Sequence, residues 1–64
     1  IMLCKNSQDA KNQAKTNSVY FSRPYAYGTD TSGNWRCERY NGKYPHPTGW
    51  TIIYPTHKSV KIGG

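Results

Sequence analysis

The chain has 64 residues, too few for a cofactor-binding α/β domain, so we expect a single domain over residues 1–64. Only eight residues are Leu, Ile, Val or Phe, and the net charge is +6, a combination that by itself favours disorder. Six Tyr and two Trp offer an alternative core. No apolar run approaches the roughly 20 residues of a membrane-spanning helix, so we expect no membrane span.

The two cysteines are predicted to form a disulfide that compensates for the small core. Cys4 and Cys37 do not have CxxC spacing, and there is no second pair for a zinc site, so we expect neither a metal nor a cofactor. Closing this loop would contribute roughly 3.5–4 kcal/mol in the chain-entropy model. Because disulfides persist in oxidising compartments, the pair indicates a secreted or periplasmic chain, and the lack of a signal segment at its amino end is typical of a processed one. The alternative is two reduced thiols in the cytosol.

The polar stretch after the first cysteine is the one helix candidate. Asn6 or Ser7 can cap a helix by accepting a hydrogen bond from a backbone N–H of the first turn. Ala10 and Ala14, four residues apart, would form a thin seam for docking. These features predict a short helix over about residues 7–16, with a solvated polar arm as the alternative.

Residue 18 onward has the pattern of β structure. Val19, Phe21, Tyr25 and Tyr27 alternate with smaller or polar residues, which predicts a strand that Pro24 interrupts or places at an edge. A second strand is predicted over residues 34–40. Its two faces would carry Trp35, Cys37 and Arg39 on one side and Arg36, Glu38 and Tyr40 on the other.

Two further strands complete the predicted sheet. The run from Trp50 to Tyr54 is a candidate for a buried strand, and residues 59–62 alternate again, with Val60 and Ile62 inward. We therefore expect a small α+β or mainly β fold. It would have a twisted antiparallel sheet of four to five short strands, one short N-terminal helix and one disulfide.

Two histidines and one glutamate are candidates for acid–base chemistry. Cleavage of RNA through its 2′-hydroxyl needs a base, an acid and cations for the developing charge. The candidate catalytic residues are His46, His57 and Glu38, with charge supplied by Arg36, Arg39 and Lys58. The alternative is that both histidines are ordinary loop residues.

The basic residues also suggest a binding surface. Guanidinium and ammonium groups displace counterions from phosphates, and exposed rings can stack on unpaired bases. The candidate contact residues are Arg36, Arg39, Lys43, Tyr44 and Lys58. The alternative is a solvated cationic surface with the aromatic residues in the core, where they cannot stack on bases.

The segment Tyr44-Pro45-His46 resembles the Tyr-Pro-His motif of the fungal guanyl-specific members of the small secreted microbial ribonucleases. Residues 38–45, followed by residues 49–52, are similar in rhythm to the barnase-type members. The resemblance covers about half of the chain. It implies that Tyr44 and His46 correspond to the tyrosine and histidine of the fungal motif.

The chain departs from the ribonuclease pattern at the next strand. The family has its catalytic glutamate there, whereas residues 50–54 contain no acidic residue. Fungal pathogens also secrete ribonuclease-like effectors without the catalytic residues, and the resemblance implies this inactive kind of relative.

We therefore expect a small, secreted, basic interaction protein of the effector or toxin type, associated with virulence. It would bind an acidic protein or RNA as a monomer through a cationic surface, and catalysis stays open as the less favoured interpretation. One alternative is a small endoribonuclease that uses the two histidines and the glutamate. The other is a cationic, bacteriocin-like antimicrobial protein.

Overall fold

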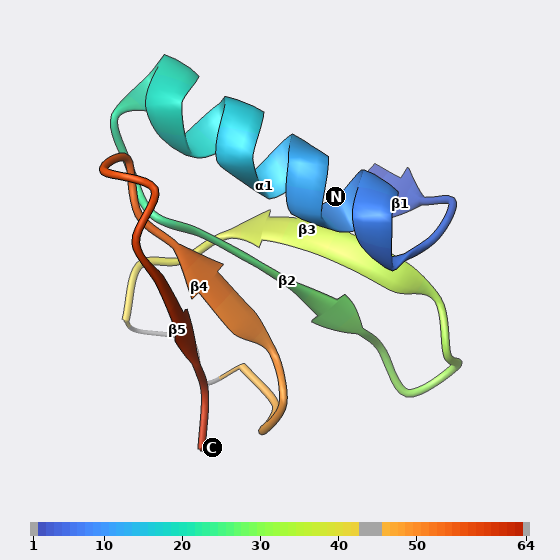
Figure 1. The fold of residues 1–64 in the computed structure, drawn as a ribbon. Coiled ribbons are helices and arrows are strands. Elements are labelled where there is room, and N and C mark those ends of the chain that lie inside the picture. The colour runs from blue at the N-terminus through green and yellow to red at the C-terminus, as the bar shows by residue number, and fades with distance from the viewer. Residues whose placement is uncertain (1, 43–45, 64) are drawn as a thin grey trace.

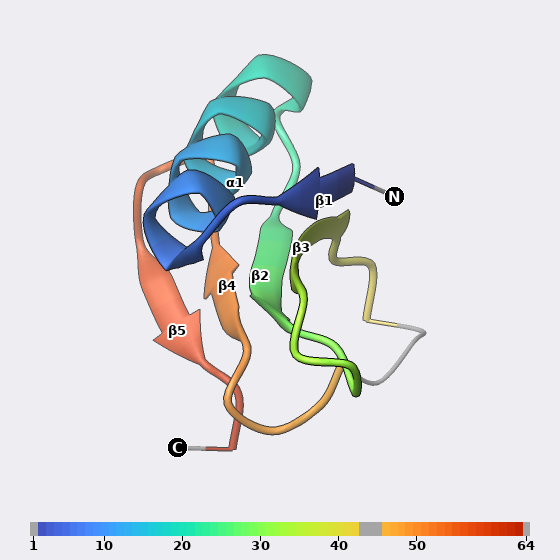
Figure 2. The same ribbon diagram turned by 90° about the vertical axis from the view of Figure 1, so that its right-hand side faces the viewer.

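The computed structural model describes residues 2–42 and 46–63. Across these residues the fold is α+β, with one helix lying over one face of a five-stranded antiparallel sheet (Figures 1 and 2). In chain order the elements are β1 (Met2–Cys4), α1 (Ser7–Phe21), β2 (Tyr25–Thr29), β3 (Trp35–Arg39), β4 (Thr51–Ile53) and β5 (Ser59–Lys61). The strand order is β1-β3-β2-β4-β5, so β2 lies at the centre of the sheet. The predicted helix is therefore present, although one strand precedes it.

The start of α1 agrees with the predicted cap. The Asn6 side chain accepts a hydrogen bond from the backbone N–H of Asp9 at 2.9 Å. The Asp9 carboxylate in turn accepts from the backbone N–H of Lys5 at 3.0 Å. The first bond satisfies a donor that the first helical turn leaves unpaired, and the second pairs the residue before the cap. Asp9 also lies where the helix dipole favours a negative charge.

The end of α1 differs from the prediction, because the helix runs on to Phe21. Its buried seam consists of Ala10, Ala14 and Ser18, which recur every four residues and are completely buried. Val19 and Phe21, which were predicted to belong to a strand, are exposed residues of this helix. A spacing of two fits a strand, but the four-residue spacing of the small side chains decides the structure here.

A left-handed residue ends the helix. Ser22 has φ 53° and ψ 43°, and the next backbone N–H, that of Arg23, donates to the Ser18 carbonyl at 3.0 Å. Pro24 follows and cannot continue a helical hydrogen-bond pattern. The first central strand, β2, therefore begins only at Tyr25.

Both faces of the sheet are packed. In the β2–β3 register Tyr27 faces Cys37, and Ala26 faces Glu38, so alternate residues point to opposite sides. The helix side contains Ala14, Cys37 and Ile53, with Cys4, Tyr25 and Tyr27 against them. The other side contains Ala26, Trp50 and Ile52, with Tyr40, Tyr54 and Ile62 against them. The prediction that aromatic residues supply much of the core is confirmed for these tyrosines and Trp50.

The last two strands follow the sequence pattern with one exception. The buried strand predicted between Trp50 and Tyr54 is β4, in which Ile52 and Ile53 are buried. Val60 was predicted to point into the core, but it is 40% exposed. It lies on the edge strand β5, where nothing in the described chain covers it enough to bury it.

The predicted disulfide is wrong. Cys4 and Cys37, both within the described chain, are not joined. The β1–β3 register places Cys4 opposite Trp35, and Met2 opposite Cys37. The cysteines are therefore diagonal neighbours, a relation that separates Cα atoms by roughly 7–8 Å, beyond the usual reach of a disulfide. The sequence argument for an oxidising compartment loses its basis with this bond.

Candidate functional site

A pocket of about 280 Å³ lies on the face of the sheet that α1 does not cover. Arg36 and Glu38 reach it from β3, because they alternate with the buried Cys37. The segment before β4 and the turn between β2 and β3 supply the remaining walls. The described residues that line this His46 pocket are Asp30, Thr31, Arg36, Glu38, His46, Pro47 and Trp50.

His46 and Glu38 meet in this pocket. The His46 Nδ1 atom lies 3.8 Å from Glu38 Oε1, beyond a normal hydrogen bond but within the range of an ion pair when the imidazole is protonated. The His46 side chain is 7% exposed and that of Glu38 31%. The imidazole is therefore buried in the wall of the pocket, whereas the Glu38 carboxylate is accessible to water. Both residues belong to the catalytic set predicted from sequence, and the fold brings them together.

Aromatic rings fix the orientation of His46. Its imidazole stacks on the Trp50 indole, with ring centroids 5.1 Å apart and an interplanar angle of 27°. Tyr40 lies on it at 5.7 Å and 32°. The Trp50 Nε1–H donates to the Thr29 carbonyl at 2.9 Å, which ties the indole to β2. These contacts limit the rotation of the imidazole and keep its Nδ1 edge toward Glu38.

The Arg36 guanidinium is committed to a neighbour within the pocket. Its Nε–H donates to Asp30 Oδ2 at 2.6 Å. The other carboxylate oxygen of Asp30 accepts from the backbone N–H groups of Asn34 and Ser32, each at 2.9 Å. The Asn34 hydrogen bond, followed by that of Arg36, lowers the pKa of Asp30 below its usual value. Asp30 therefore remains ionised and neutralises much of the charge of Arg36.

The remaining predicted site residues do not join this pocket. His57 lies in the turn between β4 and β5 and lines a different cavity, next to α1. Arg39 is exposed on β3 and alternates away from Arg36. Lys58 is exposed beside His57. Lys43 and Tyr44, which carry part of the binding prediction and of the ribonuclease resemblance, lie outside the described residues.

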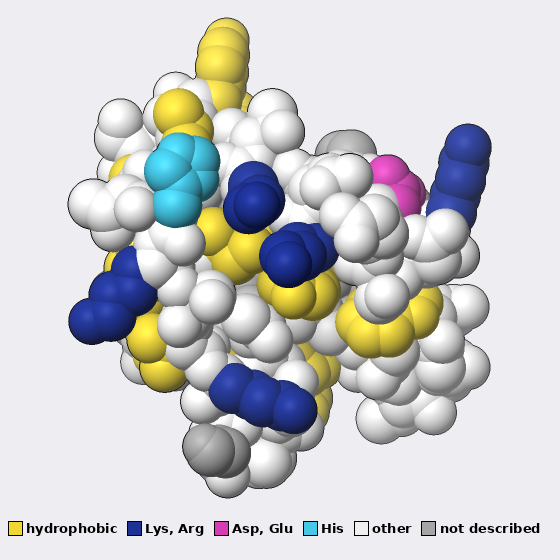
Figure 3. Space-filling view, viewed as in Figure 1, with side chains coloured by type: hydrophobic (Ala, Val, Ile, Leu, Met, Phe, Trp, Pro, Cys, Tyr) yellow, Lys and Arg dark blue, Asp and Glu magenta, His cyan; other side chains and the backbone are white. Residues whose placement is uncertain are grey.

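Sequence reasoning missed a group of lysines on the helix side of the molecule. Lys11 and Lys15 are exposed one turn apart on α1, a spacing of four that places them on one side of the helix. Lys61 pairs with Thr51 of β4, and Thr51 pairs with Tyr27 of β2. Paired residues share a face of the sheet, and Tyr27 packs on the helix side, so Lys61 also lies on the helix side. Figure 3 shows Lys and Arg side chains distributed over this face. We call the exposed residues Lys5, Lys11, Lys15 and Lys61 the lysine surface.

The His46 pocket contains side chains of the types that take part in acid–base chemistry. No group of three His, Cys, Asp or Glu side chains suited to a metal ion occurs in residues 2–42 and 46–63. The same residues contain no helix long and apolar enough to cross a bilayer. What the pocket contains is a carboxylate beside an imidazole, with a guanidinium two residues away from that carboxylate on β3.

Comparison with protein-family models, with curated proteins and with solved structures gives no match for this chain. Functional inference therefore depends on the geometry of the two regions described above, the His46 pocket and the lysine surface.

Proposed function

We propose that this protein binds a polyanionic partner, an acidic protein or RNA, through the lysine surface. The observation that carries the proposal is the separation of charge between the two faces of the sheet. Two of the three acidic residues, Asp30 and Glu38, lie in the His46 pocket, on the face opposite α1. The four lysines of the lysine surface are accompanied by one acidic residue of α1, Asp9.

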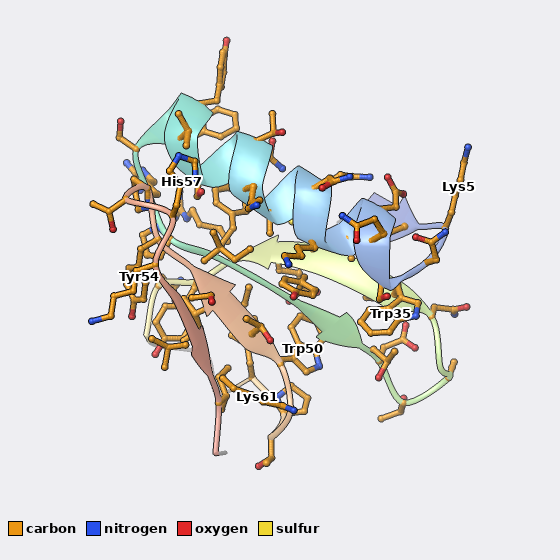
Figure 4. All side chains as sticks on the ribbon, viewed as in Figure 1. Lys5, Trp35, Trp50, Tyr54, His57 and Lys61 are labelled. Atoms are coloured by element: carbon orange, nitrogen blue, oxygen red, sulfur yellow. The ribbon has the colours of Figure 1, made fainter. Side chains whose placement is uncertain are left out.

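Such a surface attracts anions at long range and releases counterions from a phosphate backbone when it binds. Figure 4 shows Lys5 and Lys61 at widely separated points of the same view, so an extended polyanion can contact several lysines at once. An effector or toxin type of action and secretion belong to this proposal. They agree with the basic composition, and no contact in the fold specifies them.

The test is binding of fluorescein-labelled RNA and of heparin, followed by anisotropy at several salt concentrations. We expect binding that weakens steeply with salt: for a single strand, log K should fall by about 0.7 per phosphate contact for each tenfold increase in salt. Lys11→Gln should weaken binding and reduce this slope.

Arg36→Gln is the matched control, because it removes the same charge from the opposite face. It should change binding less than Lys11→Gln, provided that circular dichroism shows both variants folded. Failure of the wild type to bind either polyanion at low salt would refute the proposal. Equal losses of affinity in the two variants would show that net charge alone controls binding, and the lysine surface would no longer be the proposed binding site.

The His46 pocket supports a second candidate function, cleavage of RNA. Glu38 can accept the proton of a 2′-hydroxyl and His46 can protonate the leaving oxygen, and both side chains line the same pocket. Incubating the pure protein with RNA tests this, with His46→Ala and Glu38→Gln as comparisons. Activity that both substitutions abolish supports cleavage, and an inactive wild type excludes it.

A further inference from the structure

A second cavity, of about 360 Å³, lies between the C-terminal half of α1 and the turn that joins β4 to β5. Its described lining consists of Lys15, Thr16, Val19, Tyr20 and His57. In Figure 4 His57 lies beside the end of α1, on the same side as the lysine surface. We call this cavity the Tyr20 groove. Its volume falls within the roughly 300–1,000 Å³ of small-molecule sites.

The groove exposes apolar side chains, although the chain has few of them to build its core. The fold leaves Val19 49% exposed and Tyr20 79% exposed, although the sequence has only eight Leu, Ile, Val and Phe residues. Exposed apolar side chains that gather in one place, with polar groups at the rim, mark surfaces that bind something. The Tyr20 ring is therefore available for a contact that the isolated chain does not make.

Neighbouring rings support Tyr20 in its exposed position. Phe21 meets it edge to face, with ring centroids 4.8 Å apart. Phe21 also stacks on Tyr25 of β2 at 6.1 Å, which connects the exposed pair to the sheet. An aromatic ring braced in this way loses little conformational freedom when a flat ligand stacks on it.

The rim of the groove is cationic. Lys15 lines it directly, and Lys11 lies one turn away on the same side of α1. His57 has a left-handed backbone with φ 70°, an uncommon conformation for a residue other than glycine, and it contributes its ring to the groove wall. A ligand that matches this site needs a flat, largely apolar part next to negative charge. An unpaired nucleotide has both, whereas the carboxylates of an acidic peptide have no stacking face.

We infer that the Tyr20 groove holds an unpaired base of a single-stranded nucleic acid. The base would stack on Tyr20 beside Val19, and the flanking phosphates would contact Lys15 and the rest of the lysine surface. This inference rests on the proposed polyanion binding and narrows its partner to single strands, because a duplex keeps its bases inside the stack.

The experiment compares Tyr20→Ala with Tyr20→Phe for binding to a single-stranded RNA, its duplex, heparin and poly-glutamate at one salt concentration. We expect Tyr20→Ala to weaken single-strand binding about tenfold, the size of a lost base–aromatic stack. Tyr20→Phe keeps the ring and should bind like the wild type. Both variants should bind duplex and heparin unchanged. Because Tyr20 is exposed, we expect both to fold.

An amide chemical-shift map with the single strand should show its largest changes at Lys15, Thr16, Val19, Tyr20 and His57. If Tyr20→Ala binds the single strand as the wild type does while heparin binding persists, the inference fails and the proposed function stands. If the wild type binds none of the polyanions, both fail. If Tyr20→Ala loses poly-glutamate more than single-stranded RNA, the groove belongs to an acidic protein and the inference is overturned.

Discussion

At the scale of single residues, Gly28 illustrates how a missing side chain can build a site. It lies in β2, on the face opposite α1, and a Cβ atom there would overlap the Trp50 indole. The absence of that atom lets Trp50 pack flat on the sheet, donate to the Thr29 carbonyl and support His46 by stacking. The His46 pocket therefore depends on a residue that has no functional group.

Gly28→Ala should destabilise the protein by about 1–3 kcal/mol, because the indole must move to admit a methyl group into a packed core. Chemical denaturation followed by Trp fluorescence measures the change. Gly33→Asn is the control: Gly33 has φ 84° and open space around it, and asparagine tolerates that backbone, so we expect a change within about 0.5 kcal/mol. An unchanged Gly28→Ala variant would contradict the close packing.

The two thiols should differ in reactivity. Burial raises the pKa of Cys37 to about 11, and it also raises the pKa of the half-buried Cys4 above its ordinary value. The thiolate is the reactive form, so we expect slow alkylation of the native protein at pH 8, with Cys4 modified before Cys37. Mass spectrometry after timed exposure to iodoacetamide measures the order.

Unfolding in denaturant without a reductant should then expose both thiols to alkylation. A chain that takes up iodoacetamide only after reduction would contradict the β1–β3 register, because the two cysteines would then be joined.

At the scale of elements, the start of α1 could be predicted and its end could not. Asn6 is a local capping signal that needs no tertiary partner. The end depends on whether Val19 and Phe21 follow a spacing of two or of four, and local pattern supports both. Docking decides it, because Ser18 continues the seam of Ala10 and Ala14 against the sheet and is completely buried.

Ser22→Gly should stabilise the protein by about 0.5–1 kcal/mol. Ser22 ends α1 in the left-handed region, where an L side chain is strained and glycine is not, although glycine loses more backbone entropy on folding. Thermal denaturation measures the change in Tm. The adjacent Arg23→Gly, at a position without positive φ, should destabilise instead. A lower Tm for Ser22→Gly would show that the Ser22 side chain, rather than its backbone, sets the helix end.

At the scale of the whole molecule, charge is divided between the faces of the sheet. The alternation along β3 correctly separated Arg36 and Glu38 from Cys37, so two residues of the His46 pocket could be grouped from sequence. His57 could not be placed, because its position depends on the β4–β5 pairing. That pairing puts it beside α1, in a different cavity from His46.

Salt should stabilise the folded protein. The net charge of +6 includes the four exposed lysines of the lysine surface, and screening reduces their mutual repulsion in the compact state. Raising NaCl from low to physiological concentration should raise Tm by a few °C, since about 1 kcal/mol corresponds to about 4–8 °C in a domain of this size.

The double variant Lys11→Gln, Lys15→Gln should show a smaller salt effect than the wild type. A decrease of Tm with salt would mean that screening of the Arg36–Asp30 pair outweighs relief of the repulsion.

The amino-acid sequence by itself determined the charge, an antiparallel sheet with one short helix, the helix start and the two-sided alternation of β3. These properties arise from composition, capping and side-chain period, which act over a few residues. Only the tertiary structure decided the helix end, the separation of the two cysteines and the division of the candidate residues between two cavities. Each of these follows from strand register and helix docking, which join residues distant in the chain and have no local signature.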